Sequence, residues 1–199
     1  MSSLPYIPAL AMIPKSLPPL ERAYALLARA SDEGFKWPNA QFVLGKINEE
    51  LAETQEAIAE GDKAHVAEEI GDVLSATVNL ARFVGVDVQA LSLQPDSITT
   101  EQALAQIKDA LASADAALVN NGDMAEPMKK AVSGIASLAH NIELNAGTCL
   151  TATNEKFTAR FNAVEKVLNG QGRTMATTPL KEMIGIWNQQ KDSPAIQRT

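Results

Sequence analysis

The chain has 199 residues, of which 46% are apolar and 21% charged, so it is long enough for one folded domain and too apolar for wholesale disorder. Its net charge of −7 argues against a general nucleic-acid binder, and no apolar run reaches the roughly 18 residues of a membrane span. The N-terminus lacks a signal-peptide pattern, so we expect a cytosolic protein that binds neither nucleic acid nor membranes. The single Cys149 excludes an internal disulfide.

The N-terminal segment 1–19 contains five of the ten prolines, which predicts an extended arm. From Leu20 onward, apolar residues recur at helical spacing, and no strand pattern competes with it. We therefore expect an all-α fold: one domain over 20–190, an extra helical insert at about 92–149, and a tail at 191–199. No repeat of fixed period is evident. The expected helices cover about 20–34, 40–60, 64–84, 97–120, 127–146, 150–168 and 179–190.

Two of these helices, 40–60 and 64–84, are joined only by a short link at Gly61 and Asp62, which predicts an antiparallel hairpin. In the later helix 97–120, Thr99 and Gln102 are spaced like a capping box.

The acidity of the chain is concentrated in this hairpin, where Lys63 is the single basic residue between Glu49 and Asp72. Glu53 and Glu69 each lie eight residues from Gly61, and Glu50 and Asp72 each lie eleven, so each pair meets at one height of the hairpin. The angular positions around both helices then place four carboxylates on one side: Glu50, Glu53, Glu69 and Asp72.

Four carboxylates this close repel one another unless they are protonated or share a cation. Because the window holds no other base, a metal is the simplest partner, and oxygen ligands favour Mg²⁺ or Mn²⁺. The two histidines do not complete the Glu-x-x-His pairs of a di-iron bundle. The alternative is a solvated acidic face, or an acidic surface that binds a basic partner without catalysis.

The segments Glu49-Glu50-Leu51-Ala52-Glu53 and Glu68-Glu69-Ile70-Gly71-Asp72 resemble the E-E-x-x-E and E-E-x-x-D motifs of the MazG-like nucleoside triphosphate pyrophosphohydrolases, which are all-α proteins related to dimeric dUTPases. The likeness covers about 20–91 and 150–190 but not the insert. Further segments that match in order are 34–38, 78–82, 154–161, 171–173 and 182–187.

The resemblance implies a MazG-like helical bundle that hydrolyses a nucleoside triphosphate to the monophosphate and pyrophosphate with Mg²⁺, in nucleotide-pool control. Glu50, Glu53, Glu69 and Asp72 would be the metal ligands, and Glu49 would orient or deprotonate the attacking water. The family's assembly implies a homodimer or homotetramer. A relative that acts on phosphoribosyl-ATP or another pyrophosphate-linked metabolite remains an alternative.

On the substrate side, Lys156 and Arg160 match the basic pair of the family and share one helical face, which suits triphosphate oxygens. Trp37 and Trp187 are candidates for stacking on the base, and core packing is an equal alternative for each. Asn79 and Asn154 are candidates for contacts with sugar or phosphate, against the alternatives of capping and helix packing.

Overall fold

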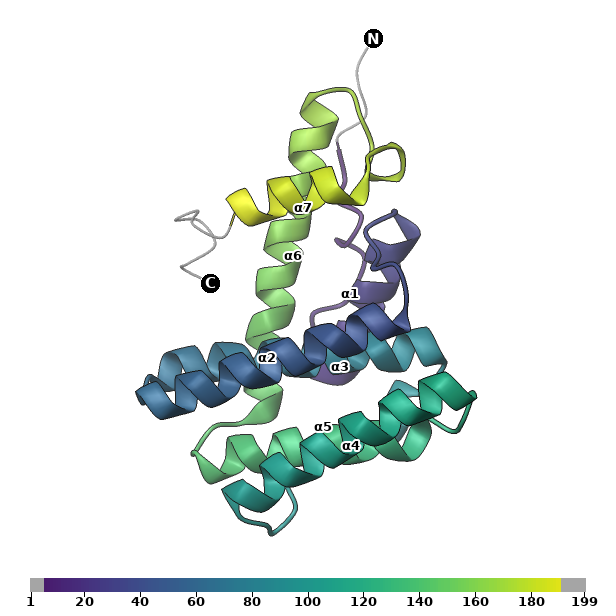
Figure 1. The fold of residues 1–199 in the computed structure, drawn as a ribbon. Coiled ribbons are helices and arrows are strands. Elements are labelled where there is room, and N and C mark those ends of the chain that lie inside the picture. Colours follow the sequence, from purple (N-terminus) through teal and green to yellow (C-terminus); the bar gives the residue numbers. More distant parts are fainter. Residues whose placement is uncertain (1–5, 191–199) are drawn as a thin grey trace.

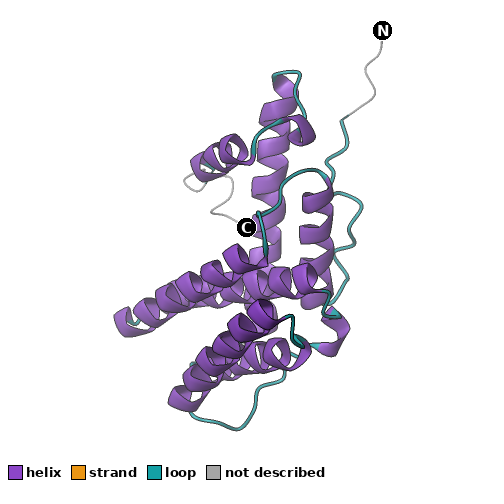
Figure 2. Cartoon of the chain, turned by 45° about the vertical axis from the view of Figure 1, so that its right-hand side comes forward, coloured by secondary structure: helices purple, strands orange, loops and turns teal. Residues whose placement is uncertain are grey.

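The computed structural model describes residues 6–190, and every regular element in this range is helical (Figures 1 and 2). The expected all-α fold is therefore confirmed. None of the described helices is long and apolar enough to cross a membrane. The elements are α1 (Pro19–Asp32), α2 (Ala40–Glu60), α3 (Lys63–Val84), η1 (Val88–Ala90), α4 (Thr100–Asn120), α5 (Ala125–Asn141), α6 (Ala146–Gly170), η2 (Met175–Thr177) and α7 (Leu180–Gln189).

Local signals set the bounds of the acidic hairpin formed by α2 and α3. The Asn39 side chain accepts a hydrogen bond from the Phe42 N–H and caps α2, which ends at Gly61 in the left-handed conformation with φ of 76°. The Asp62 side chain then accepts hydrogen bonds from the first backbone N–H groups of α3. The predicted hairpin is thus present with the expected register.

The boundary between α5 and α6 differs from the expectation of helices at 127–146 and 150–168. The chain leaves α5 after Asn141, passes through Glu143 with φ of 57°, and enters α6 at Ala146. Asn145 causes the early start, because its side chain accepts a hydrogen bond from the Thr148 N–H at 2.9 Å. The capping box of Thr99 and Gln102 is present as predicted.

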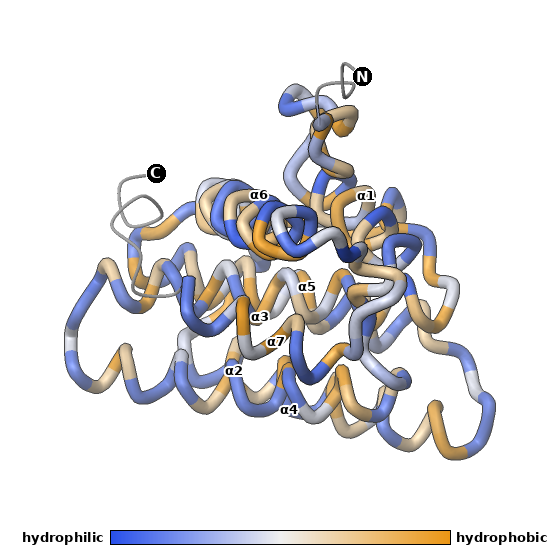
Figure 3. The backbone as a smooth tube through the Cα atoms, turned by 90° about the horizontal axis from the view of Figure 1, so that it is seen from above, coloured by the Kyte–Doolittle hydropathy of each residue, from blue (hydrophilic) through white to orange (hydrophobic). Residues whose placement is uncertain are grey.

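The helices form two hairpins and a crossing helix. The α4–α5 hairpin lies alongside the α2–α3 hairpin, while α6 stands steeply across them with α1 beside it and α7 across its far half (Figure 1). Apolar and hydrophilic residues alternate along these helices in the way that one-sided burial requires (Figure 3). The acidic hairpin is therefore covered by α4–α5 on one face and by α6 on another.

Two separate clusters of buried apolar residues stabilise this arrangement. The larger core joins the first half of α1, helices α2 to α5 and the first turns of α6, and the smaller core joins the second half of α1, the far half of α6 and α7. Residues 6–18, which belong to the predicted arm, pack against the smaller core: Leu10 is buried in it, and the Ala9 N–H donates to Glu165 on α6 at 3.1 Å.

Candidate functional site

The hairpin brings the predicted carboxylates together. Ligand oxygens of Glu50, Glu53 and Glu69 all lie within 4.8 Å of one another. Asp72 lies one turn after Glu69 on α3, and its Oδ1 accepts a hydrogen bond from Thr153 Oγ1 on α6 at 3.2 Å. The acids are thus clustered at matched heights of the hairpin.

Burial and mutual repulsion perturb these carboxyl groups. Burial, followed by the charges of Asp72, Glu50 and Glu53, raises the pKa of Glu69 to about 7. Burial also raises the pKa of Asp72 to about 6, and burial with the Glu50 charge raises the pKa of Glu53. The cluster is therefore costly to ionise without a positive partner.

Glu69 shows that the cluster fits a cation. The residue is only 7% exposed, and Oε2 is buried without any hydrogen-bond partner among the described residues. Its other oxygen, Oε1, lies 3.2 Å from Nε2 of His65, which is itself exposed. An unpartnered buried carboxylate oxygen beside two further carboxylates matches the all-oxygen donor set of hard divalent cations, so these residues could hold one.

Lys46 is a neighbour of the cluster that the sequence reasoning missed. The acidic window was counted from Glu49, whereas Lys46 lies one helical turn earlier and places Nζ 3.0 Å from Glu49 and 3.0 Å from Glu50. Burial lowers the pKa of Lys46, but hydrogen bonds to Glu50 and Glu49 outweigh that effect and raise it. The expectation that no base lies near the carboxylates is therefore wrong for Glu49 and Glu50, whereas Glu69 has no lysine or arginine partner among the described residues and only His65 beside it.

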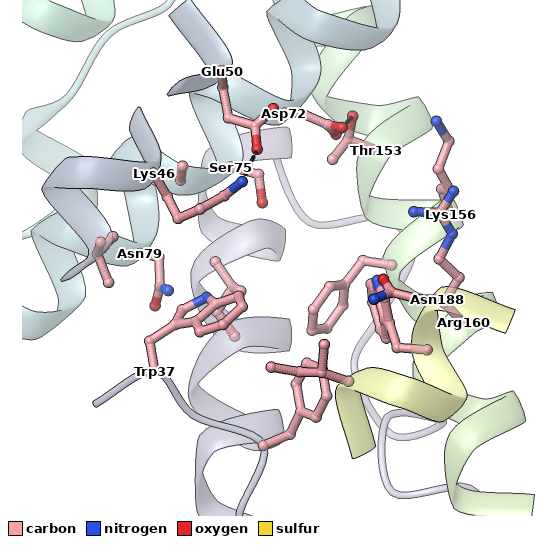
Figure 4. A pocket seen from close by; sticks show the side chains of 17 residues that line it. Trp37, Lys46, Glu50, Asp72, Ser75, Asn79, Thr153, Lys156, Arg160 and Asn188 are labelled. Atoms are coloured by element: carbon pink, nitrogen blue, oxygen red, sulfur yellow. Dashed lines mark hydrogen bonds and ion pairs between the residues drawn. The ribbon is translucent and has the colours of Figure 1, made fainter. Parts of the chain in front are cut away.

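A cavity of about 260 Å³ opens beside the acidic hairpin (Figure 4). Carboxylates of Glu50 and Asp72 line it at one end, and Trp37 lies at the other end with further aromatic rings. Lys156 and Arg160 project from α6 along its side. The side with Lys156 and Arg160 can thus bind negatively charged groups, and the aromatic end offers flat apolar surface.

The two basic residues on α6 are held differently. Lys156 forms an ion pair with Glu68 of α3, the neighbour of Glu69 in sequence. The Arg160 guanidinium lies 5.8 Å from the centre of the Trp187 ring, and its Nε is buried without a hydrogen-bond partner among the described residues. Arg160 therefore retains unused hydrogen-bonding capacity beside the cavity.

The aromatic wall draws rings from three parts of the chain. Trp187 on α7 stacks on Phe35 with ring centres 5.2 Å apart, and Phe157 on α6 approaches it at 5.3 Å. Trp37 instead stacks on Phe42 at 5.1 Å. Both tryptophans line the cavity while they pack against neighbouring rings, so the packing and pocket interpretations hold together.

Only some of the other predicted site residues line the cavity. Asn79 lines the cavity, and its Oδ1 accepts hydrogen bonds from Arg82 at 3.1 and 3.2 Å. Asn154 is buried elsewhere: its Nδ2 donates to the Pro19 carbonyl at 3.0 Å, which matches the helix-packing alternative. Glu49 is half exposed and is paired with Lys46. Ser75, Thr153 and Asn188 line the cavity without having been singled out.

Residues 40–92, which contain the acidic hairpin and its cluster of carboxylates, match the family model of the MazG nucleotide pyrophosphohydrolase domain. This match confirms the resemblance to MazG-like nucleoside triphosphate pyrophosphohydrolases. It covers α2, α3 and η1.

Two curated proteins that are similar to this chain carry related names. The nucleoside triphosphate pyrophosphohydrolase of Escherichia coli K12 is 28% identical over 185 residues, which are 92% of this chain and 48% of that protein. The nucleoside triphosphate pyrophosphohydrolase/pyrophosphatase MazG of Thermotoga maritima is 40% identical over 74 residues, which are 37% of this chain and 28% of that protein. The chain thus spans about half the length of the Escherichia coli relative. No solved structure matches the chain significantly.

Proposed function

We propose that this chain hydrolyses nucleoside triphosphates to the monophosphate and pyrophosphate in the presence of a divalent cation, Mg²⁺ with Mn²⁺ as a substitute. The observation that carries the proposal is the buried, unpartnered Glu69 oxygen within an acidic cluster that adjoins a cavity lined by Lys156 and Arg160. The names of the relatives support the same reaction.

The acidic cluster is the proposed cation site, with Glu50, Glu53, Glu69 and Asp72 as ligands. A bound cation would neutralise phosphate charge at the anhydride bond that is broken between the α and β phosphates. Burial is the main cause that raises the pKa values of Glu69 and Asp72, so a bound cation would favour the ionised form of both groups. Glu49 is the proposed group that orients or deprotonates the attacking water.

Lys156 and Arg160 are the proposed partners of the remaining phosphate oxygens. They lie four residues apart on one face of α6 and line the same cavity as Glu50 and Asp72. Lys156 would exchange its ion pair with Glu68 for phosphate, whereas the Arg160 Nε has no described partner to give up. Guanidinium and ammonium groups bind phosphate strongly through charge-assisted hydrogen bonds.

The aromatic end of the cavity is the proposed base site. Trp37 and Trp187 offer faces for stacking, and Asn79 offers an amide whose oxygen is already engaged by Arg82. The Asn79 amino group is then available as a donor to an acceptor on the base or sugar. Asn154 is left out of this proposed set because its amide is bonded to Pro19.

The cavity favours a small-molecule substrate over a purely electrostatic partner surface, because an interaction face needs no buried carboxylates beside an aromatic pocket. Phosphoribosyl-ATP or a related metabolite would need the same phosphate chemistry and remains the alternative substrate. The cytosolic location and the homo-oligomer that the resemblance implies stay predictions. The packing of α4 and α5 against α2 and α3 bears on the oligomeric state.

The test is release of pyrophosphate from the standard ribonucleoside and deoxyribonucleoside triphosphates, with dUTP, ITP and phosphoribosyl-ATP added, in the presence and absence of Mg²⁺. We expect cation-dependent pyrophosphate together with an equal amount of monophosphate. Folded protein that releases no pyrophosphate from any triphosphate, or that releases orthophosphate instead, would contradict the proposal.

A further inference from the structure

The α4–α5 hairpin matches the α2–α3 hairpin in the length of its first helix, whereas α5 has 17 residues and α3 has 22. Helices α2 (Ala40–Glu60) and α4 (Thr100–Asn120) both have 21 residues, and their bounds differ by 60 positions at both ends. Helices α3 and α5 begin 62 positions apart, at Lys63 and Ala125. No repeat is evident in the sequence, whereas the starts of these helices recur at a nearly constant offset.

The two hairpins also begin and turn in the same way. Asn39 and Thr99, again 60 apart, each accept a hydrogen bond from the backbone N–H of the third helical residue. Helix α2 ends at Gly61 with φ of 76°, and α4 ends at Asn121 with φ of 51°, so both turns start with a left-handed residue. The second turn is longer by two residues, which accounts for the change of offset from 60 to 62.

Buried positions recur at these offsets, which is the strongest sign that one hairpin repeats the other. Along α2 and α4, the same four core positions are filled, with identical residues at two of them. Along α3 and α5, the apolar stripe is likewise preserved. The buried pairs are Val43 and Ala103, Ile47 and Ile107, Leu51 and Leu111, Thr54 and Ala114, Val66 and Met128, Ile70 and Val132, and Val73 and Ile135.

The acidic cluster is the part that the second hairpin lacks. Every proposed cation ligand is replaced by an uncharged residue: Glu50 by Ala110, Glu53 by Ser113, Glu69 by Ala131 and Asp72 by Gly134.

The surroundings have also changed. Lys130 stands at the position of Glu68, and it lines a surface hollow of about 510 Å³ together with Ala110 and Ser113. At Gly134, an added Cβ would lie 2.8 Å from Ile107, so an aspartate no longer fits there. The second hairpin therefore keeps the core-facing pattern and has no means of binding a cation in the same way.

The mutual packing of the hairpins has the pattern of a two-fold axis. Helix α2 contacts α4, and α3 contacts α5, so each helix packs on its own counterpart. Ile47 and Ile70 share one apolar core with Ile107 and Ile135. A contact between an element and its own copy is what an isologous dimer interface generates.

We propose that α4–α5 is an internal copy of the acidic hairpin that has lost its carboxylates and occupies, within one chain, the place of a second subunit's hairpin. A single chain is then a complete unit with one cation site. This inference uses the geometry of the acidic cluster and does not depend on which reaction the site performs.

The first experiment is sedimentation equilibrium of the full chain from about 1 to about 100 µM, because self-association follows mass action. We expect the mass of one chain, 21.2 kDa, throughout the range. A mass twice that of the chain at any of these concentrations would overturn the proposal, since the cover that α4–α5 gives to α2–α3 would not then replace a partner.

The second experiment compares Ile47→Ala with Ile107→Ala, which remove the same side-chain atoms at equivalent and fully buried positions of the two hairpins. If the hairpins are halves of one bundle, calorimetry shows one unfolding transition, and both variants lower its Tm to a similar extent. Two transitions, with Ile107→Ala moving only one of them, would show that α4–α5 is a separate appendage. Neither readout involves catalysis, so an inactive triphosphate assay would leave both results interpretable.

Discussion

Lys46 Nζ lies 3.0 Å from Glu50 Oε1, so one of the proposed cation ligands already has a positive partner, while Oε2 of the buried Glu69 has no hydrogen-bond partner among the described residues. Lys46 therefore supplies part of the charge that a cation would supply. Its position beside the cavity also means that bound phosphate and Glu50 would compete for the same ammonium group.

Replacing Lys46 in the absence of nucleotide tests its effect on cation binding apart from its effect on phosphate binding. Because Lys46→Met removes a cation beside Glu50, we expect Mg²⁺ to bind about fivefold more tightly in the absence of nucleotide, a change on the order of 1 kcal/mol. The measurement is a calorimetric Mg²⁺ titration. The matched control is Lys63→Met, since Lys63 pairs instead with Glu143. An unchanged or weaker affinity for Lys46→Met alone would show that the cation binds away from Glu50.

Glu53→Gln tests the cluster itself. The substitution removes one ligand charge and relieves repulsion with Glu50, so we expect the fold to be retained and turnover to fall about 100-fold or more. Steady-state pyrophosphate release measures the first effect and circular dichroism checks the second. Glu56→Gln, one turn away on α2 and outside the cluster, is the control and should retain activity. Near-native activity in Glu53→Gln would remove Glu53 from the site.

The raised carboxyl pKa values predict a pH dependence for the metal-free protein. The pKa of Glu69 rises from 4.5 in the unfolded chain to about 7 on folding, so the folded state holds a proton that the unfolded state has released. The stability from this group is full below about pH 4.5 and is lost as the pH rises toward 7. Asp72 acts in the same direction between 3.8 and about 6.

Melting curves at pH 5 and pH 8 measure this loss. We expect the Tm of the wild-type chain to fall further between the two values than the Tm of Glu69→Gln, by roughly 3 °C, which is the scale of 1 kcal/mol in a chain of this size. Saturating Mg²⁺ at pH 8 should recover the difference in the wild-type chain. Parallel pH profiles for the two proteins would mean that Glu69 does not titrate abnormally.

Gly71 lies where α3 packs against α6, and we expect a larger residue there to lower the stability of the chain. An added Cβ there would overlap Thr153 Oγ1 and lie 2.7 Å from the Cys149 carbonyl oxygen. Although alanine is the better helix former, we expect Gly71→Ala to destabilise the chain by about 2 kcal/mol through overpacking. Gly45→Ala on α2 meets nothing within 4 Å and should stabilise it by about 0.5–1 kcal/mol. Urea denaturation of both variants gives the comparison, and a stabilised Gly71→Ala would mean that α6 can move away.

The acidic hairpin was predictable from sequence because its determinants are local. Asn39, Gly61 and Asp62 fix where the two helices begin and end, and the helical repeat then brings Glu53 and Glu69 to one height. The same reasoning missed Lys46 because acidic residues were counted within a window of sequence rather than along the helix face, where residues three and four apart are neighbours.

Longer-range features escaped sequence reasoning. The amide of Asn154 bonds to the Pro19 carbonyl because α6 crosses the start of α1, and no spacing within 154–161 reveals that contact. The repeat of the hairpin was hidden because core positions tolerate exchange among apolar residues of different size, as at Val66 and Met128. Its helix lengths and caps became comparable only once the bounds were known.

The two apolar cores support different parts of the cavity wall. The carboxylates adjoin the larger core through Ile70 and Val73, whereas Phe157 and Trp187 belong to the smaller core with α7. Trp37, by contrast, packs against the larger core. Substitutions at Phe157 or Trp187 therefore fall on the smaller core, away from the acidic hairpin. Under the proposed function, this division would let related chains change the base they prefer over evolutionary time while the carboxylates stay constant.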